Sequence, residues 1–275
     1  MVNIDKAGGY SSFIMEKHWQ EINFLVYNKK TEKERKEVRM KYRWKLWLGM
    51  MVSLMVIYII LISSVDFFCF NRSFYHYEYG KLETAKQLGM SDAALDRATD
   101  TLLDYLQDQR DDIKIREEIY GWEREVFNER ETLHMVDVKN LYQGVLSLRN
   151  LMIVLASTLA VFLFLENRSE FWEVMSAAYL RTAIGCAFVL GLLLLYAIAD
   201  FTTFWTNFHK VFFTNDLWLL NPNTSIMINM FPETFFHHLV LLIGSSVMIV
   251  FVFCFIASVW YQRKLRIQFN VSVKS

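Results

Sequence analysis

Four long apolar runs divide this chain of 275 residues, and no charged residue lies near the middle of any of them. A helix rises ~1.5 Å per residue, so ~20 residues cross the ~30 Å hydrocarbon core of a bilayer. The two middle runs are shorter, although the first of these extends upstream if the Arg149 side chain snorkels towards the interface. The sequence therefore predicts an all-α integral membrane protein whose four transmembrane helices cover residues 46–65, 149–165, 182–200 and 239–261.

Basic residues beside the first and last runs predict how the chain is oriented in the membrane. Nine Lys and Arg residues lie between Lys29 and Lys45, and Arg263, Lys264 and Arg266 follow the fourth run. Such clusters stay in the cytoplasm. We therefore expect both the N- and the C-terminus to be cytoplasmic. The expected cytoplasmic segments are a basic extension at residues 1–45, a loop at 166–181 and a tail at 262–275, and the extracytoplasmic segments are residues 66–148 and 201–238.

The extracytoplasmic segments carry patterns that are typical of helices. Leu and Ala recur at helical spacing after Ser91, which predicts an amphipathic helix from Asp92 to Gln107. Asn128 and Glu131 have the spacing of a capping box, which predicts a second helix that leads towards the second span. In the later segment, aromatic residues three or four apart predict a helix at the membrane interface. Together these patterns predict a small, mainly helical cap.

Several common functional motifs are absent from the sequence. It contains no HExxH zinc motif, no GxSxG elbow, no Walker loop and no dinucleotide-binding fingerprint. Cys69, Cys186 and Cys254 lie in or beside apolar runs, so we interpret them as small hydrophobic residues without a redox role. The formal net charge is zero. We expect membrane lipids among the partners and no nucleic acid.

Histidine is the residue type to examine, because its unperturbed pKa of ~6.5 lets it accept and return a proton near neutral pH. Of the six histidines, His134 and His209 lie in extracytoplasmic segments, near a membrane boundary and among apolar or aromatic residues. Asp137 lies three residues after His134 on the same helical face, where its carboxylate can orient the imidazole or favour its charged form. We expect ordinary polar roles for the others, His18, His76, His237 and His238.

Composition and spacing leave three functions open. The histidine pair is compatible with catalysis by proton transfer. His134, Asp137 and His209 are also compatible with a metal site, because imidazole and carboxylate bind zinc and leave a position for water. The protein would then be a metal-dependent membrane hydrolase. The third alternative is a non-enzymatic assembly or sensor protein whose cap binds a partner.

Three motifs on the extracytoplasmic segments go further than composition. They are ERETLHMVDVKNLY at residues 129–142, FHKVFFTNDLW at residues 208–218 and NPNTSIMINMFPETFF at residues 221–236. In this order the chain resembles the lipoprotein intramolecular transacylase family, Lit, of Gram-positive bacteria. The resemblance covers roughly residues 46–266, including the four-span layout, and does not extend to the N-terminal segment.

The resemblance implies both a site and a reaction. The family's two essential histidines fall on His134 and His209, and Glu131, Asp137 and Asp216 match positions with a supporting role. In the implied reaction, one acyl chain, expected to be the sn-2 chain, moves from an S-diacylglyceryl group to the α-amine of the N-terminal cysteine. The product is a lyso-form lipoprotein. The expected partner is a diacylated lipoprotein, no cofactor or metal is expected, and the active site would lie on the extracytoplasmic face of the bacterial cell membrane.

The implied reaction suggests roles for further residues. Its tetrahedral intermediate carries an oxyanion, which a protonated imidazole can stabilise, or, as we hypothesise, Arg149 or Arg130. The aromatic helix around His209 is expected to line the side from which lipid enters. Its expected substrate-binding residues are Phe208, Phe212, Phe213 and Trp218. The oligomeric state and the choice of lipoprotein substrates stay open.

Overall fold

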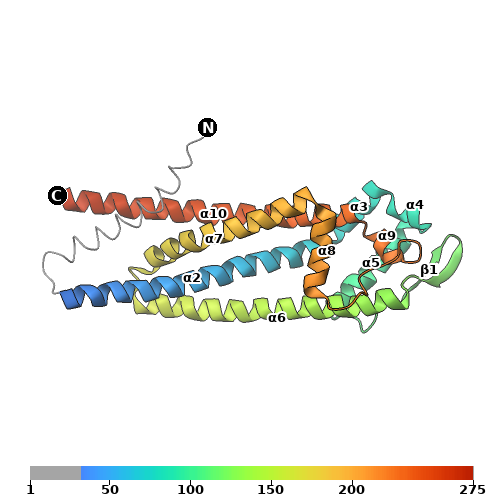
Figure 1. Ribbon diagram of the computed structural model, residues 1–275, viewed down its shortest axis with the longest axis horizontal. Helices are drawn as coiled ribbons and strands as arrows, with labels where there is room; N and C mark the ends of the chain where they lie inside the picture. Colours follow the sequence, from blue (N-terminus) through green and yellow to red (C-terminus); the bar gives the residue numbers. More distant parts are fainter. Residues whose placement is uncertain (1–31, 275) are drawn as a thin grey trace.

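Four long helices form the body of the protein in the computed structural model, which describes residues 32–274 (Figure 1). They are α2 (Glu32–Cys69), α6 (Glu129–Glu166), α7 (Phe171–Ala199) and α10 (Glu233–Lys274). Each is long and apolar enough to cross a membrane, and each predicted span falls on one of them. The predicted all-α fold with four membrane helices is therefore confirmed. Most of the predicted N-terminal extension, with His18, lies outside the described residues.

α2 is the central helix of the bundle, because it packs against α6, α7 and α10. One close contact lies at Gly49, where an added Cβ would come within 2.9 Å of the Ala178 Cβ on α7. Near this contact, the Lys45 ammonium lies 3.1 Å from the Glu170 carboxylate and 3.9 Å from that of Glu166. These ion pairs tie the short connection between α6 and α7 to α2.

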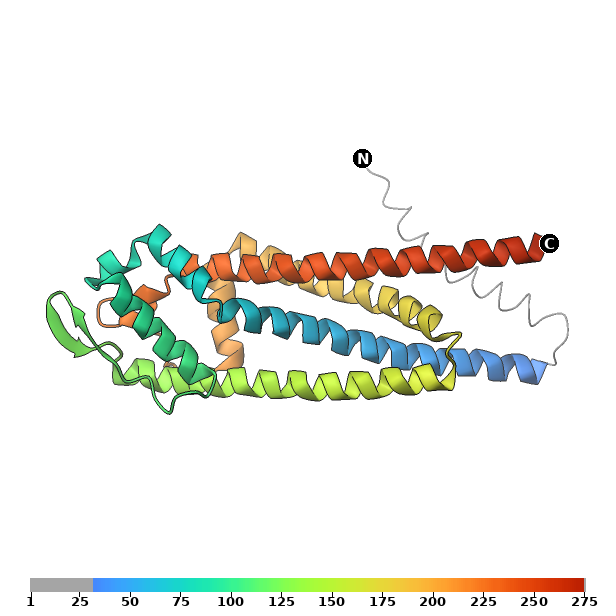
Figure 2. The ribbon, with the colours of Figure 1, turned by 180° about the vertical axis from the view of Figure 1, so that it is seen from behind.

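A cap covers one end of the bundle, opposite the end at which the C-terminus lies (Figures 1 and 2). It consists of α3 (Arg72–Leu82), α4 (Thr84–Leu88), α5 (Asp92–Leu106), α9 (Ile226–Met230), β1 (Arg116–Ile119) and β2 (Trp122–Glu125). The apolar face of α5 supplies much of its core, since Leu95 and Ala98 are fully buried. The predicted amphipathic helix is confirmed, and the Ser91 side chain caps it by accepting a hydrogen bond from the Ala94 N–H.

The sequence patterns do not predict the antiparallel hairpin of β1 and β2. Its turn residues, Tyr120 and Gly121, have φ values of 52° and 81°, and a type I′ hairpin turn requires positive φ at both positions. Contacts outside the hairpin hold Tyr120 in this conformation. Its N–H donates to the Gly89 carbonyl at 2.8 Å, and its hydroxyl donates to the Gln87 carbonyl at 2.6 Å. Gly89 leaves room for the ring, because a Cβ there would lie 2.4 Å from a ring carbon.

α8 (Phe201–Phe212) crosses the bundle at a steep angle, between the long helices and the cap (Figure 1). It begins directly after α7, where the Asp200 side chain accepts a hydrogen bond from the Thr203 N–H at 3.0 Å. The predicted aromatic helix therefore lies across the spans, which is the orientation of a helix in the plane of a membrane interface. Its C-terminal part, which carries His209, reaches the first turns of α6.

Candidate active site

His134 and His209 meet where α8 reaches the first turns of α6. α6 is one helix of 38 residues that begins in the cap and continues through the second predicted span, so the position of His134 is fixed relative to that span. The centroids of the two imidazole rings are 6.1 Å apart, and the rings lie at 35° to each other. His134 is 8% exposed, and His209 is half-buried. The fold thus joins two residues that are far apart in the chain into one site.

An aromatic cage surrounds the His209 ring. It consists of Trp205, Phe208, Phe213 and Trp218, whose ring centroids lie 5.0, 5.6, 5.7 and 5.0 Å from that of His209. Phe213 also lies 5.3 Å from the His134 ring. Phe212 packs on Phe208 at 4.8 Å and is itself exposed on the outside of the cage. Three of the four expected substrate-binding residues therefore contact a histidine, and the fourth lies behind them.

Trp205 fixes the tautomer of His209. Its backbone carbonyl lies 2.8 Å from His209 Nδ1, and a carbonyl can only accept a hydrogen bond. The proton of neutral His209 is therefore on Nδ1, and Nε2 keeps its lone pair. Burial lowers the pKa of His209, while the Trp205 carbonyl acts in the opposite direction. The site assignment from the sequence missed Trp205, although its place one helical turn before His209 is a signal that could have found it.

His134 is buried as a neutral base. Its Nδ1 atom is shielded from solvent and has no hydrogen-bond partner within the described part of the chain. Burial lowers its pKa to about 4, and the neighbouring His209 and Arg130 act in the same direction. Asp137 opposes them and raises the pKa of His134. At neutral pH this imidazole is uncharged and can accept a proton.

A buried neutral histidine makes the folded protein sensitive to acid. The pKa of His134 is about 4 in the folded state, below the ~6.5 of an unfolded chain. The unfolded state binds more protons between these values, so this part of the stability is complete above pH ~6.5 and is lost as the pH falls towards 4. We expect the free energy of unfolding to decrease by on the order of 2 kcal/mol between pH 7 and about pH 4.5. Thermal unfolding in detergent should show a smaller decrease for His134→Asn, and equal decreases in both proteins would contradict this prediction.

Two contacts fasten the segment after α8 to the first turns of α6. The Asp137 carboxylate accepts a hydrogen bond from Asn215 Nδ2 at 2.8 Å, and the Arg130 guanidinium donates to the backbone carbonyl of Asp216. Asp137 therefore acts on His134 through its charge and does not orient the ring by a direct hydrogen bond. Asp216 contributes its backbone to the site. Asn215 was not predicted, and no local pattern in the sequence singles it out.

Glu131 lies one turn before His134 and is completely buried, at 0% exposure. One carboxylate oxygen accepts hydrogen bonds from the Ser225 hydroxyl at 2.5 Å and the Met227 N–H at 2.7 Å. The other accepts from the Asn128 N–H at 2.6 Å, and this completes the predicted capping box. The carboxylate thus joins the start of α6 to the start of α9. Its supporting role is to hold the segments on either side of the site together.

Comparison with known protein families assigns the chain to one of them. The model of the family "Lipoprotein intramolecular transacylase Lit" matches residues 50–236, which is more than half of the 275 residues. The chain belongs to the Lit family. The matched region contains both histidines, the aromatic cage and all the helices and strands of the cap. The predicted family is therefore confirmed.

Solved structures of one Lit protein share the fold of this Lit-family chain. The membrane-integral lipoprotein intramolecular transacylase Lit from Bacillus cereus aligns with a TM-score of 0.65 and 21% identity, over 82% of this chain and 99% of that chain. Variants of that protein with one histidine changed to alanine or to arginine align at 20% identity and a TM-score of 0.63, over 84% and 86% of this chain and 99% of theirs. None of the curated proteins compared with the chain matches it.

Arg149 of this Lit-family protein lies away from the histidines. It follows His134 by fifteen positions on α6, which is about 22 Å along a helix that rises ~1.5 Å per residue. Its guanidinium is 2.9 Å from the Asp66 carboxylate on α2, which also accepts a hydrogen bond from the Tyr142 hydroxyl at 2.6 Å. The hypothesis that Arg149 stabilises the oxyanion is corrected accordingly, because its charge is paired with Asp66. Arg130 is the arginine whose charge acts on His134.

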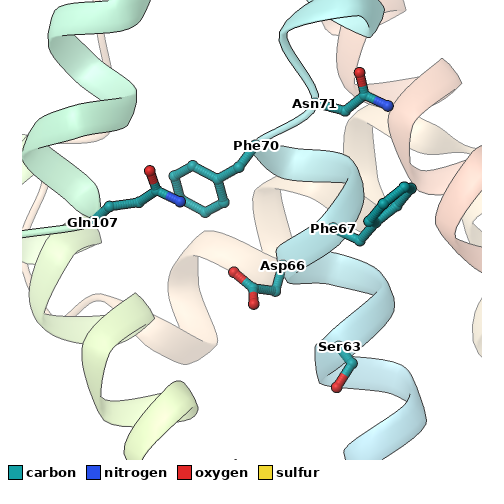
Figure 3. Close-up of a pocket in the computed structure, with 6 residues that line it drawn as sticks. All are labelled: Ser63, Asp66, Phe67, Phe70, Asn71 and Gln107. Carbon is teal, nitrogen blue, oxygen red and sulfur yellow. The ribbon is translucent and has the colours of Figure 1, made fainter.

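A cavity of about 480 Å³ lies beside the Asp66 carboxylate and not at the histidine pair (Figure 3). It is lined by Ser63, Asp66, Phe67, Phe70, Asn71 and Gln107. The centroid of the Phe70 ring lies 4.9 Å from that of the Tyr142 ring, so the cavity adjoins the part of α6 between His134 and Arg149. Its one acidic lining residue, Asp66, is engaged by Arg149 and by the Tyr142 hydroxyl. We therefore place the candidate active site of the Lit-family chain at His134 and His209.

The other described histidines make structural contacts. His238 lies with Nδ1 2.7 Å from the buried carboxylate of Glu78 on α3, the His237 ring packs 5.2 Å from that of Phe201, and His76 is exposed. Among residues 32–274, no group of three His, Cys, Asp or Glu side chains is arranged to hold a metal ion. The geometry therefore gives no support to a metal-dependent hydrolase.

Proposed function

We propose that this Lit-family protein transfers the sn-2 acyl chain of an S-diacylglyceryl group to the α-amine of the same N-terminal cysteine in a bacterial lipoprotein. The product is the lyso-form lipoprotein. The observation that carries the proposal is the pair of imidazoles, 6.1 Å apart between centroids and enclosed by aromatic rings. The exchange of an ester for an amide within one molecule is downhill, so it needs proton transfer and no external acyl donor.

The two histidines differ in what they can do with a proton. A free α-amine has a pKa of ~7.7–8.0, so part of the substrate arrives as an ammonium ion. His209 Nε2 takes the first proton from it, because Nδ1 is committed to the Trp205 carbonyl. His134, which is neutral at this pH, accepts the second proton as the amine nitrogen attacks the ester carbonyl.

Collapse of the intermediate completes the balance of atoms. The new N–C bond remains, the C–O bond to glycerol breaks, and His209 returns its proton to the departing glyceryl oxygen. The proton on His134 is released to solvent, so an ammonium and an ester become an amide, an alcohol and a proton. Because amine and ester belong to one molecule, their correct placement can lower the barrier by up to ~7–11 kcal/mol.

Arg130 is the candidate for stabilising the oxyanion of the intermediate. Its guanidinium is held by the Asp216 carbonyl, and its positive charge lowers the pKa of His134. A fixed positive charge beside the reacting carbonyl stabilises negative charge as it develops. Protonated His209 adds a second positive charge during the step.

The arrangement of α8 suits a substrate whose acyl chains stay in the bilayer. Val211 and Phe212 on its outer side are 77% and 48% exposed, although both are apolar. Exposed apolar residues on a helix that lies across the spans suit contact with lipid. We place the cap and the histidines on the extracytoplasmic face, with both termini in the cytoplasm, because of the basic clusters at the inner ends of the first and fourth spans.

Mass spectrometry of the N-terminal lipopeptide of an abundant lipoprotein tests the function. The cells should normally make the diacyl form, and they are compared with and without this chain. We expect the diacyl peptide to be converted to an isobaric N-acyl, S-monoacylglyceryl form, which fragmentation distinguishes. An unchanged lipopeptide in cells that contain the folded protein would overturn the proposal.

A further inference from the structure

His134 has an unpartnered Nδ1 atom, although a carboxylate that would be expected to form a hydrogen bond with it lies on the same helix. Asp137 follows His134 by three positions, so the two side chains share a face of α6. A carboxylate in this position commonly orients an imidazole and favours its charged form. Yet Nδ1 has no hydrogen-bond partner within the described residues, and the Asp137 carboxylate forms its hydrogen bond with another residue.

Asn215 is the hydrogen-bond partner of Asp137. Its Nδ2 donates to Asp137 Oδ2 at 2.8 Å. Its other amide atom, Oδ1, accepts a hydrogen bond from the Leu217 N–H at 3.0 Å. A backbone N–H can only donate, so the amide has one possible orientation and its donor faces Asp137. The next residue is also fastened, because the Asp216 carbonyl accepts a hydrogen bond from Arg130.

We propose that Asn215 is a positioning residue that holds the Asp137 carboxylate away from His134 and thereby keeps the imidazole in its neutral, basic form. The inference rests on the proposed function, in which the neutral imidazole accepts the amine proton. A direct hydrogen bond between Asp137 and His134 would favour the charged imidazole, which cannot act as a base.

The charged and titratable groups around His134 agree with this role. His209 faces it from α8, and Arg130 and Asp137 face it from α6 itself. His209 and Arg130 lower the pKa of His134, and Asp137 raises it. The segment after α8 presents the neutral amide of Asn215 and the backbone of Asp216. Asp137 is thus the group whose closer approach would return His134 to its charged form.

Two substitutions at Asn215 release Asp137 in different ways. Asn215→Ala removes the donor, whereas Asn215→Asp keeps an acceptor for the Leu217 N–H and repels the Asp137 carboxylate. In Asn215→Ala we expect the pKa of His134 to rise by about one pH unit, since an opposite charge at close range favours the charged form. In Asn215→Asp the added carboxylate contributes to the rise as well. The pKa is measured by NMR titration of protein labelled in its histidine rings, and His134→Gln identifies the signal. The apparent pKa of the acid limb of the pH–rate profile should increase by the same amount.

Two controls separate positioning from a general loss of structure. Asp137→Asn combined with Asn215→Ala should abolish the rise, because no carboxylate is left to approach His134. Asn207→Ala removes another asparagine of the same region, whose Nδ2 donates to the Tyr196 hydroxyl at 2.8 Å, and should leave the pKa unchanged.

The NMR titration tests the role of Asn215, and the lipopeptide assay tests the proposed function, so each can be contradicted without the other. A His134 pKa that stays at the wild-type value in folded Asn215→Asp overturns the inference, whatever the activity. A raised pKa in a protein that never converts the lipopeptide overturns the proposed function and leaves the contact between Asn215 and Asp137 as the control of His134.

Discussion

His134→Ala is expected to slow the formation of lyso-form lipoprotein by about 10²- to 10⁴-fold, the range that a general acid or base contributes. Alanine cannot accept the amine proton that the neutral imidazole of His134 is expected to take. His209→Ala should have an effect of similar size, because Nε2 of His209 returns a proton to the leaving oxygen. Groups that act as one unit are not additive, so the double variant should be little slower than the slower single variant. Initial rates of lyso-form peptide, measured by mass spectrometry, give all three values.

His76→Ala is the matched control for these substitutions. It removes a histidine from the same cap, but its side chain is 76% exposed and lies away from the site on α3. Its rate should equal that of the wild type. If folded His134→Ala also kept the wild-type rate, the histidine would have no part in the chemistry and the proton path through it would have to be abandoned.

Glu131→Ala is expected to lower the free energy of unfolding by about 3 to 5 kcal/mol, because it breaks a buried charged network. The substitution leaves the Ser225 hydroxyl and the backbone N–H groups of Met227 and Asn128 without their acceptor. It also leaves a cavity at a position that is completely buried. Because the network joins α6 to α9 beside His134, activity should be lost with stability. Thermal unfolding of the purified protein in detergent measures the change.

Glu129→Ala is the control for the effect of charge. Glu129 lies in the same first turn of α6 and is exposed, so its removal costs only the ~0.3–1 kcal/mol of a charge near a helix N-terminus. Glu131→Gln should fall between the two, since the amide keeps one acceptor and the volume of the side chain. Equal stabilities of Glu131→Ala and Glu129→Ala would show that the buried network does not stabilise the junction.

Local sequence patterns were sufficient to predict the features that form within a single helix. The uncharged runs predicted four spans, and four long helices are found. The capping box at Asn128 and the amphipathic helix after Ser91 were likewise predicted within a residue or two. Each depends on residues no more than a few turns apart, so the sequence can encode it without knowledge of the rest of the chain. Position and surroundings made His134 and His209 candidates among the six histidines, and the family resemblance then implied that they are the essential pair.

Contacts between distant segments were beyond such reasoning. Tyr120 takes a positive φ because Gly89 and Gln87 hold it, and no pattern within the hairpin contains that information. Arg149 was one of two arginines of an extracytoplasmic segment proposed for the oxyanion, but its partner is Asp66 on another helix. The identity of a charged residue is visible in the sequence, whereas its partner depends on which helix packs beside it.

The sequence by itself determined that the chain has four spans, where α5 and α6 begin, and which family it resembles. Hydropathy, periodicity and capping act within single helices, and this is why they could be read directly. Only the tertiary structure decided that α8 crosses the spans and that the ring centroids of His134 and His209 lie 6.1 Å apart. It also decided that Asn215 donates a hydrogen bond to the Asp137 carboxylate. These distances follow from the packing of segments far apart in the chain, and packing is a property of the whole fold.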